Sequence, residues 1–424
     1  MNHELYQNYL RILEEELVPA LGCTEPIAVA YAAAKARETL GSFPEKMTAE
    51  CSGNIIKNVK GVVVPTTGDL RGTRAAAILG AVGGDAGREL EVLTTVKPED
   101  VERVRALLDE GLCEEKLLET PAKLHIIIRM EGGGHSSMVE IIHSHTGIVR
   151  IEKDGQVLLD VPHTEAEADT ARTDRTCLSI TDILAFADQV DIKDVSAILD
   201  RQIEYNTQIS KVGLKGGYGA EVGATLLSTY GNDVKVRARA AAAAGSDARM
   251  SGCEMPVVIN SGSGNQGMTA SLPVIEYAKE LGADRVKLYR ALCVSNLVAI
   301  HQKTGIGKLS AYCGAVSAAT GAGAGIIYLY GGGEEDVSKV IVNTLGNVSG
   351  IVCDGAKPSC AAKIASCVDA AILAINMAMK DRFFRPGEGI VKSDVEATIA
   401  SVGELARDGM RQTDTEILKI MVSD

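Results

Sequence analysis

Apolar residues near the start of the chain recur with the spacing of an α-helix. They predict a helix over residues 4–18 that ends before Pro19, with an apolar face formed by Leu5, Tyr9, Leu10, Ile12, Leu13 and Leu17. An alanine-rich stretch predicts a second helix from Thr24, a good N-cap residue, to about Thr39. Cys23 then lies in the turn immediately before this second helix.

The following stretch, to about residue 165, mixes short β-rich runs with helical ones. The expected strands are Val62–Val64, Leu124–Ile128 and a meander of Val139–Ile142, Ile148–Ile151 and Val157–Val161. The expected helices are Arg74–Val82 and Pro98–Leu108. The polar and acidic segment Glu165–Thr176 predicts a linker.

After Ser179 the pattern is almost entirely helical, interrupted by glycine-rich loops at residues 213–219, 261–267, 321–325 and 331–333. This order of elements predicts an α+β fold, in which an N-terminal mixed α/β region is followed by a mainly helical C-terminal domain. We expect three units: N-terminal helices that carry Cys23 (residues 1–40), a mixed α/β domain (41–170) and a helical domain (171–424).

The composition is that of a globular protein, with 46% hydrophobic and 23% charged residues. A net charge of −13 argues against nucleic acid or an anionic membrane as the main partner. The first 17 residues contain acidic side chains and no apolar segment typical of a signal peptide. Ten cysteines without such a signal predict a cytoplasmic location, where cysteine serves metal binding, catalysis or packing.

Three of these cysteines suit a metal cluster. Cys313 and Cys353 lie beside glycine-containing turns, and Cys360 follows Pro358 at an expected helix start, where the helix dipole favours a thiolate. Three thiolates would leave one iron of a [4Fe–4S] cluster open to substrate. The alternative is that all three are small buried residues, and Cys367, seven residues after Cys360, is a competing ligand.

Two further segments suggest a binding site. Cys23 precedes a helix N-terminus, where a thiolate is again favoured, although a structural role is equally compatible with the pattern. The loop at residues 261–267 can direct donors at a carboxylate or phosphate through Ser261, Ser263, Asn265 and Gln266. Its alternative interpretation is a tight turn between two helices.

Other candidates carry weaker signals. His135 lies in a glycine-rich loop between two strands, and His143 and His145 alternate on a strand. The turns at residues 66–69 and 213–219 offer hydroxyl or backbone groups. We expect the remaining cysteines to be structural, namely Cys51, Cys113, Cys177, Cys253 and Cys293.

Four motifs together resemble the L-cysteine desulfidase family, which is related to the α-chain of iron–sulfur L-serine dehydratases. They are Leu21-Gly-Cys-Thr-Glu-Pro26, Asn260-Ser-Gly-Ser-Gly-Asn-Gln-Gly267, Gly307-Lys-Leu-Ser-Ala-Tyr-Cys-Gly314 and Gly350-Ile-Val-Cys-Asp-Gly-Ala-Lys-Pro-Ser-Cys360. The resemblance extends over nearly the whole chain. It implies a [4Fe–4S] cluster held by Cys313, Cys353 and Cys360, an active-site position for Cys23, and no ligand role for Cys367.

The reaction that this resemblance implies is α,β-elimination of L-cysteine to pyruvate, ammonia and sulfide. The open iron would act as a Lewis acid toward the β-sulfur, and a base would remove the α-proton. Cys23 is the candidate for that base or for a transient iron ligand, and the residues at 261–267 would hold the carboxylate. L-Serine dehydration by the same chemistry is the alternative substrate choice.

Two other functions are compatible with parts of the sequence. The Ser-Gly-Ser-Gly-Asn-Gln-Gly loop resembles the carboxylate loop of one class of pyridoxal-phosphate lyases, but the C-terminal half lacks alternating strands and helices. A non-enzymatic iron–sulfur redox sensor would use four protein ligands and no substrate loop. We expect a small amino acid as ligand, no nucleic-acid or membrane partner, and possible assembly into a homo-oligomer.

The resemblance also predicts an arrangement of the units. Cys23 should reach the cluster, so we expect the N-terminal helices to pack on the helical domain rather than on the strands.

Overall fold

The computed structural model describes residues 1–163, 173–307 and 310–422 and contains two β-sheets. In spatial order, the larger sheet consists of β3 (Cys113–Leu117), β2 (Lys46–Cys51), β4 (His125–Gly132), β5 (His135–Ile142), β6 (Ile148–Lys153) and β7 (Gln156–Asp160). Strands β2 and β3 are parallel, and the other neighbours are antiparallel. The smaller sheet pairs β1 (Pro19–Leu21) with β8 (Pro256–Val258) and so joins the N-terminal segment to the helical part.

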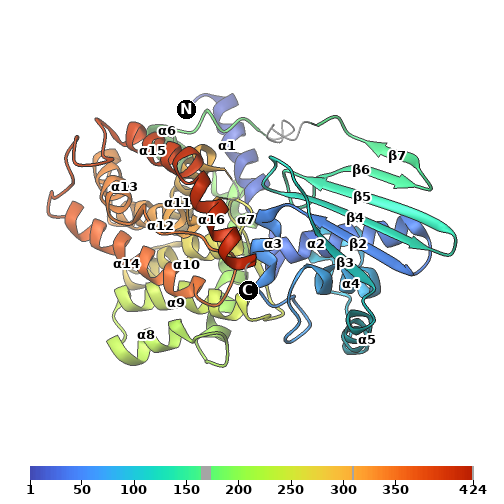
Figure 1. Cartoon of the computed structure of the whole chain (residues 1–424). Coiled ribbons are helices and arrows are strands. Elements are labelled where there is room, and N and C mark those ends of the chain that lie inside the picture. The colour runs from blue at the N-terminus through green and yellow to red at the C-terminus, as the bar shows by residue number, and fades with distance from the viewer. Residues whose placement is uncertain (164–172, 308–309, 423–424) are drawn as a thin grey trace.

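The helices divide between the two parts of the molecule (Figure 1). The N-terminal part contains α1 (His3–Glu16), α2 (Thr24–Leu40), α3 (Gly53–Lys60), α4 (Thr73–Gly83), η1 (Ala86–Glu91) and α5 (Pro98–Asp109). The C-terminal part contains α6 (Ile180–Gln189), α7 (Ile192–Gly213), α8 (Val222–Tyr230), α9 (Val234–Met250), α10 (Gly264–Glu280), α11 (Arg285–Ile306), α12 (Gly314–Leu329), α13 (Glu334–Val348), α14 (Cys360–Ala378), α15 (Val395–Glu404), η2 (Leu405–Gly409) and α16 (Arg411–Val422). The predicted α+β class, with its helical C-terminal part, is confirmed.

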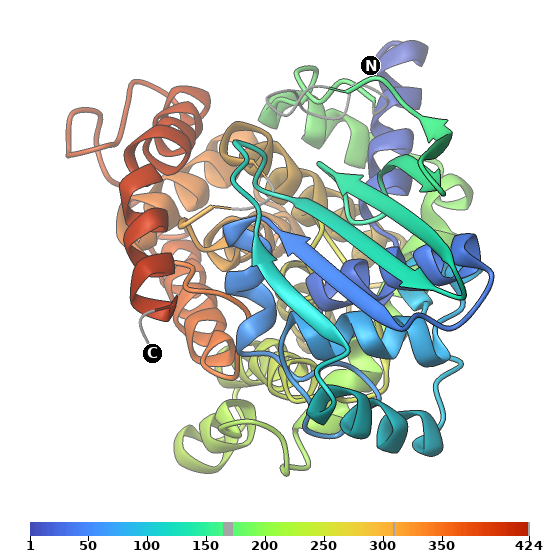
Figure 2. The same ribbon diagram turned by 45° about the vertical axis from the view of Figure 1, so that its right-hand side comes forward.

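One face of the larger sheet is covered by α2, which packs on β4 and β5 and against α4 (Figure 2). Alternate residues of the strands point into this layer, so Ile126 and Ile128 are completely buried. The expectation that both N-terminal helices avoid the strands is therefore wrong for α2. It applies to α1, which contacts α7 and α11. Helix α2 is rich in alanine and buried on nearly all sides, so it can pack on the sheet while its first turn reaches the helical part.

The predicted meander is present as β5, β6 and β7, and the run at 124–128 opens β4. The strand expected at Val62–Val64 is wrong, because Val63 forms only an isolated bridge with Arg71. Strands β2 and β3 were not predicted. Most of the linker expected at Glu165–Thr176 lies outside the described residues, and the boundaries of the three units stay a prediction.

The loop expected at residues 321–325 is also wrong, because these residues lie within α12. A Cβ atom on Gly321 would lie 2.3 Å from the carbonyl oxygen of Ser295 in α11, and one on Gly325 would lie 2.7 Å from that of Ala291. These glycines therefore permit two helices to approach closely rather than breaking one of them.

Helix α14 is, within the described part of the chain, long and apolar enough to cross a membrane by length and composition. Of its most apolar window, 56% is buried inside the protein, against neighbours that include α9, α12 and α13. The core helix of a globular protein has the same properties, so this helix is weak support for a membrane span.

Candidate functional site

A cavity of about 100 Å³ lies where the two parts of the chain meet. The residues around it come from α2, from the β5–β6 turn and from the starts or ends of several C-terminal helices. Every site residue predicted from the sequence lines it, namely Cys23, Ser261, Ser263, Asn265, Gln266, Cys313, Cys353 and Cys360. Segments more than 300 residues apart in the sequence therefore contribute to one site.

Four helices direct their N-termini at this cavity. Cys23 is the N-cap of α2, Ser263 of α10 and Cys313 of α12, while Cys360 is the first residue of α14. None of the four N-termini has a side-chain cap. Helix N-termini carry partial positive charge and free N–H groups, so their convergence favours an anionic group such as a carboxylate or a thiolate.

Cys313 and Cys353 are brought together by backbone pairing. Tyr312 and Val352 form an antiparallel bridge, flanked by hydrogen bonds from the Cys313 N–H to the Ile351 oxygen (3.0 Å) and from the Cys353 N–H to the Ala311 oxygen (2.6 Å). Burial, together with the neighbouring Cys353, raises the pKa of the Cys313 thiol to about 12. Burial also raises the pKa of the Cys360 thiol, so the thiolate predicted there from the start of α14 is wrong in this structure, because desolvation outweighs the helix dipole. The thiols of Cys313, Cys353 and Cys360 are free, and each of these residues is partly exposed.

Three free thiols that line one cavity are the donor set that an iron–sulfur cluster takes. Among the described residues, no group of three or more His, Cys, Asp or Glu side chains is arranged to hold one metal ion. A [4Fe–4S] cluster binds one thiolate on each iron, so its ligands need not converge on one point. Lys303 and Lys363 interact electrostatically with these thiols and can offset the charge of thiolates. Cys367 is completely buried and absent from the cavity lining.

The position of Cys23 before a helix predicts an ionised thiol, but its environment in the structure favours a protonated one. It is 1% exposed, and its Sγ donates a hydrogen bond to Oε2 of Glu25 at 3.1 Å. Burial and the adjacent Glu25 charge raise the pKa of the Cys23 thiol well above its usual value, and Arg249 opposes this only in part. The thiolate prediction for Cys23 is therefore wrong in this structure, because desolvation and a neighbouring carboxylate outweigh the helix dipole.

Glu25 is ionised in this environment. Burial acts to raise the pKa of its carboxyl, but the neighbouring His145, the Cys23 thiol and Arg249 lower it to about 2. The Nε2 atom of His145 lies 3.9 Å from Oε1 of Glu25 and has no hydrogen-bond partner within the described part of the chain. A buried carboxylate thus stands directly beside the thiol of Cys23.

Residues 261–267 form another wall of the cavity, but the loop predicted there is wrong beyond Ser263, because Gly264 begins α10 and Asn265 and Gln266 lie in its first turn. The hydroxyl of Thr24 donates a hydrogen bond to the Gly262 oxygen (3.0 Å), which connects α2 to this loop. Ser261 donates to Oδ1 of Asn260, and Oδ1 of Asn265 accepts from Nη1 of Arg249 at 3.2 Å. The oxygen of the Asn265 amide is therefore already engaged by the protein.

Sequence reasoning missed several cavity residues, including Glu25, Asn58, Arg249, Lys303, Ser310 and Tyr312. Glu25 lies inside a recognised motif, but its pairing with Cys23 depends on the turn geometry. His145 lines the cavity, whereas His135 is exposed and hydrogen-bonded to Asp154. The turns at residues 66–69 and 213–219 do not line the cavity.

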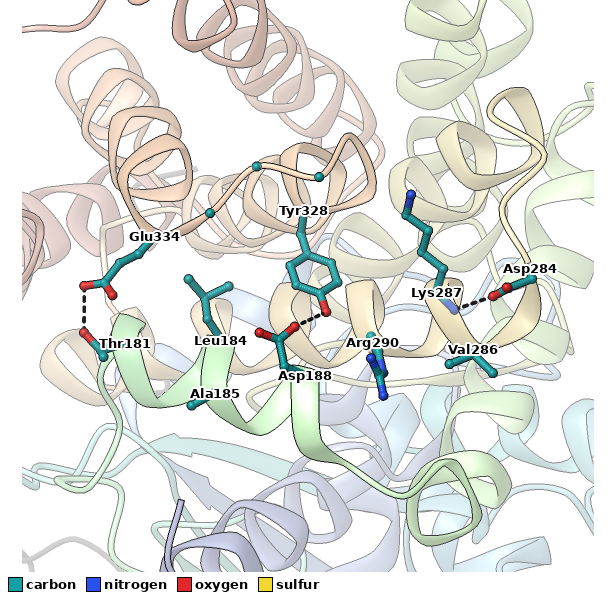
Figure 3. A pocket seen from close by; sticks show the side chains of 13 residues that line it. Thr181, Leu184, Ala185, Asp188, Asp284, Val286, Lys287, Arg290, Tyr328 and Glu334 are labelled. Carbon is teal, nitrogen blue, oxygen red and sulfur yellow. Dashed lines mark hydrogen bonds between the residues drawn. The ribbon is translucent and has the colours of Figure 1, made fainter.

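A larger hollow, about 720 Å³, lies elsewhere, between α6, α11 and the loop at residues 331–333 (Figure 3). Thr181 donates a hydrogen bond to Glu334 there, and Tyr328 donates one to Asp188. Among the described residues that line it there is no cysteine. It therefore lacks the chemistry that distinguishes the smaller cavity.

Residues 87–419 match the family model described as serine dehydratase alpha chain. The chain belongs to this family. Proteins named UPF0597 protein are similar over nearly the full length. That of Lachnoclostridium phytofermentans is 60% identical over 99% of this chain and 100% of its own. The relative from Desulfitobacterium hafniense is 54% identical (99% and 97%), and that from Treponema denticola is 51% identical (99% and 98%).

The predicted relation to serine dehydratase α-chains is therefore confirmed. The part of the chain that matches the serine dehydratase alpha chain model contains Cys313, Cys353, Cys360 and the loop at 261–267, and it begins after Cys23. Serine dehydratases are lyases, so membership of this family associates the chain with lyase activity.

Proposed function

We propose that this protein is an iron–sulfur-dependent lyase that converts L-cysteine and water to pyruvate, ammonia and sulfide. The observation that carries the proposal is the single cavity in which three free thiols, the Cys23–Glu25 pair and a donor-rich loop meet. Membership of the serine dehydratase alpha chain family supports the same class of reaction.

Cys313, Cys353 and Cys360 would hold a [4Fe–4S] cluster, which supplies a Lewis acid when bound. The Tyr312–Val352 bridge holds Cys313 beside Cys353, and the start of α14 holds Cys360. Lys303 and Lys363 place positive charge near the sulfur atoms, which lowers the cost of three thiolates in one buried region.

The substrate carboxylate would lie against the loop at residues 261–267. Removal of an α-proton spreads negative charge onto the carboxylate, so donors aimed at it stabilise the transition state more than the ground state. The N-termini of α2 and α10 border the same space and act in the same direction. We propose Ser261, Ser263, Asn265 and Gln266 as the residues that form this subsite.

Cys23 would handle a proton. A thiol must lose its proton both to act as a base and to bind a metal, and Oε2 of Glu25 already accepts the hydrogen bond from its Sγ. The pKa of the Glu25 carboxyl, about 2, lies far below that of the thiol, so Glu25 holds the Sγ–H in place and does not take its proton. Glu25 is therefore proposed as a positioning residue for the Cys23 thiol.

L-Serine is the alternative substrate, with hydroxide as the leaving group and the same protein groups in use. The preference for L-cysteine rests on leaving-group chemistry and on sulfur affinity, since a thiolate leaves more readily than hydroxide and is a good ligand for iron. The carboxylate subsite is common to both amino acids and should not discriminate between them.

Of the other functions considered, a pyridoxal-phosphate lyase gains one supporting observation. Lys303 is buried in the cavity, and desolvation lowers the pKa of its amine to about 8, as a Schiff-base lysine requires. The three free thiols in the same cavity have no role in that reaction. A redox sensor would leave the substrate loop without a role.

The deciding experiment is anaerobic purification, followed by iron and acid-labile sulfide analysis and by measurement of pyruvate and sulfide formed from L-cysteine and from L-serine. We expect about four irons and four sulfides per chain and faster turnover of L-cysteine. Faster turnover of L-serine would reverse the substrate assignment. Activity that requires added pyridoxal phosphate and no iron would replace the proposal by its rival. The cytoplasmic location, the absence of nucleic-acid or membrane partners and homo-oligomer formation stay predictions.

A further inference from the structure

Arg249 is a buried cation whose hydrogen-bonding capacity is only partly used. It lies in the last turn of α9, is 2% exposed and lines the cavity. Its Nε donates to the carbonyl oxygen of Gly22 at 2.8 Å, and its Nη1 donates to Oδ1 of Asn265 at 3.2 Å. Both acceptors are neutral. Its Nη2 is buried and finds no acceptor among the residues that the structure describes.

The surrounding chain is shaped to hold the guanidinium in this place. A Cβ atom on Gly264 would lie 2.4 Å from Nε of Arg249, so glycine at this position lets α10 begin close to the guanidinium. The carbonyl of Gly22 before α2 and the side chain of Asn265 at the start of α10 accept hydrogen bonds from the guanidinium and fix its orientation. A side chain held by two separate segments is preorganised for a ligand rather than free to move toward solvent.

Such an arrangement is costly unless an anion completes it. A buried charge is tolerated when it is paired, and a buried donor without an acceptor loses the hydrogen bonds that it would make with water. Among the described residues, the direct hydrogen-bond acceptors of Arg249 include no carboxylate. The charge of Glu25 acts on it only from a distance.

We infer that Arg249 binds the α-carboxylate of the amino-acid substrate, an assignment that rests on the proposed function. A guanidinium presents parallel N–H donors that match a carboxylate, and an ammonium cannot reproduce this match. The loop at residues 261–267 supplies further donors from the other side. Asn265 acts here as a positioning residue, because its Oδ1 holds Nη1 of Arg249.

The inference specifies the ligand class. The site requires a free α-carboxylate, so amides and esters of the same amino acids should bind poorly. L-Alanine is a suitable probe because it has the carboxylate and ammonium of the substrate but no β leaving group. L-Alaninamide has the same size without the charge, and inorganic sulfate tests whether any small anion suffices.

The experiment uses the anaerobically purified protein with its cluster and measures inhibition of L-cysteine turnover together with direct calorimetric binding of each probe. We expect wild type to bind L-alanine at least tenfold more tightly than L-alaninamide or sulfate. Arg249→Gln should weaken L-alanine binding by roughly ten- to a hundredfold, as expected for loss of a charge-assisted hydrogen bond, and abolish the preference over L-alaninamide. Arg249→Lys should restore only part of it.

A matched control is Arg239→Gln on the same helix, because Arg239 pairs with Asp369 and does not line the cavity. It should leave the preference intact. Iron content and circular dichroism establish that each variant is folded, and Arg249→Lys keeps the charge should Arg249→Gln not fold. An Arg249→Gln or Arg249→Lys protein that retains the full preference overturns the assignment. Wild type that binds none of the amino-acid probes overturns the proposed function together with it, and equal binding of sulfate overturns the carboxylate specificity alone.

Discussion

Replacing Glu25 by glutamine should destabilise the protein by an amount that its environment allows us to work out. Burial alone would raise the pKa of this carboxyl, but His145, Cys23 and Arg249 lower it from an ordinary value of 4.5 to about 2. At about 1.36 kcal/mol per pH unit, that difference corresponds to roughly 3 kcal/mol of stability. Because the pKa is lower in the folded state, this contribution is present above about pH 4.5 and is lost as the pH falls toward 2.

The assay is anaerobic urea denaturation of wild type and Glu25→Gln at several pH values. At pH 7 we expect the variant to be about 3 kcal/mol less stable, and the difference should shrink as the pH is lowered from 4.5. The control is Glu38→Gln, because Glu38 lies on the same helix but pairs with Lys35 at the surface. Equal stability of Glu25→Gln and wild type at pH 7 would refute the reasoning.

The same substitution tests the pairing with Cys23. If Glu25 acts by positioning the Cys23 thiol, both residues serve one step, so the turnover lost in Cys23→Ala and Glu25→Gln should not add. The double variant should be about as slow as the slower single variant. Losses that multiply would show that the two residues act independently.

Three further outcomes are expected. Alanine at Cys313, Cys353 or Cys360 should remove both the bound iron and the turnover, whereas Cys367→Ala, in the buried core, should keep both. Iron that is retained in Cys313→Ala but lost in Cys367→Ala would refute the ligand set. Asn265→Ala should reduce turnover of L-cysteine and L-serine by a similar factor, roughly ten- to a thousandfold, in steady-state pyruvate assays. Burial raises the pKa of Asp247 to about 6, so wild-type stability should decrease as the pH rises from 3.8 through 6. Asp247→Asn should therefore melt at a higher temperature than wild type at pH 8 but not at pH 4, and equal melting temperatures at pH 8 would contradict this.

Secondary structure was predictable where packing leaves a strong periodic pattern. The first two helices and the β5–β7 meander follow directly from the spacing of apolar residues. Strand β3, Cys-Glu-Glu-Lys-Leu, was not predicted because it is largely polar, and its extended form comes from hydrogen bonds to β2. Strand β2, Lys-Met-Thr-Ala-Glu-Cys, does alternate polar residues with the buried Met47, Ala49 and Cys51, but it contains few β-branched or aromatic residues, so its strand signal is weak. Glycines 321, 323 and 325 predicted a loop but lie within a helix, because close contact between two helices favours glycine just as a turn does.

The candidate site shows the same division. Cys313, Cys353, Cys360, Cys23 and the loop at residues 261–267 could be singled out from motifs alone, because each couples a reactive or donor side chain to a turn or helix start. Their meeting in one cavity depends on contacts between distant segments, such as the Tyr312–Val352 bridge. Arg249 carries no local signal at all, because it sits in an alanine-rich helix like any other basic residue.

The sequence by itself determined which reactive side chains this protein has, and it placed several of them at helix N-termini, where the helix dipole acts on them. Only the tertiary structure decided their charge states and partners. Cys23 illustrates the physical reason: its position before a helix favours a thiolate, but complete burial and a carboxylate 3.1 Å away raise the pKa of the thiol instead. Desolvation and pairing act between residues that only folding brings together, and in this cavity they outweigh what each residue's neighbours in sequence predict.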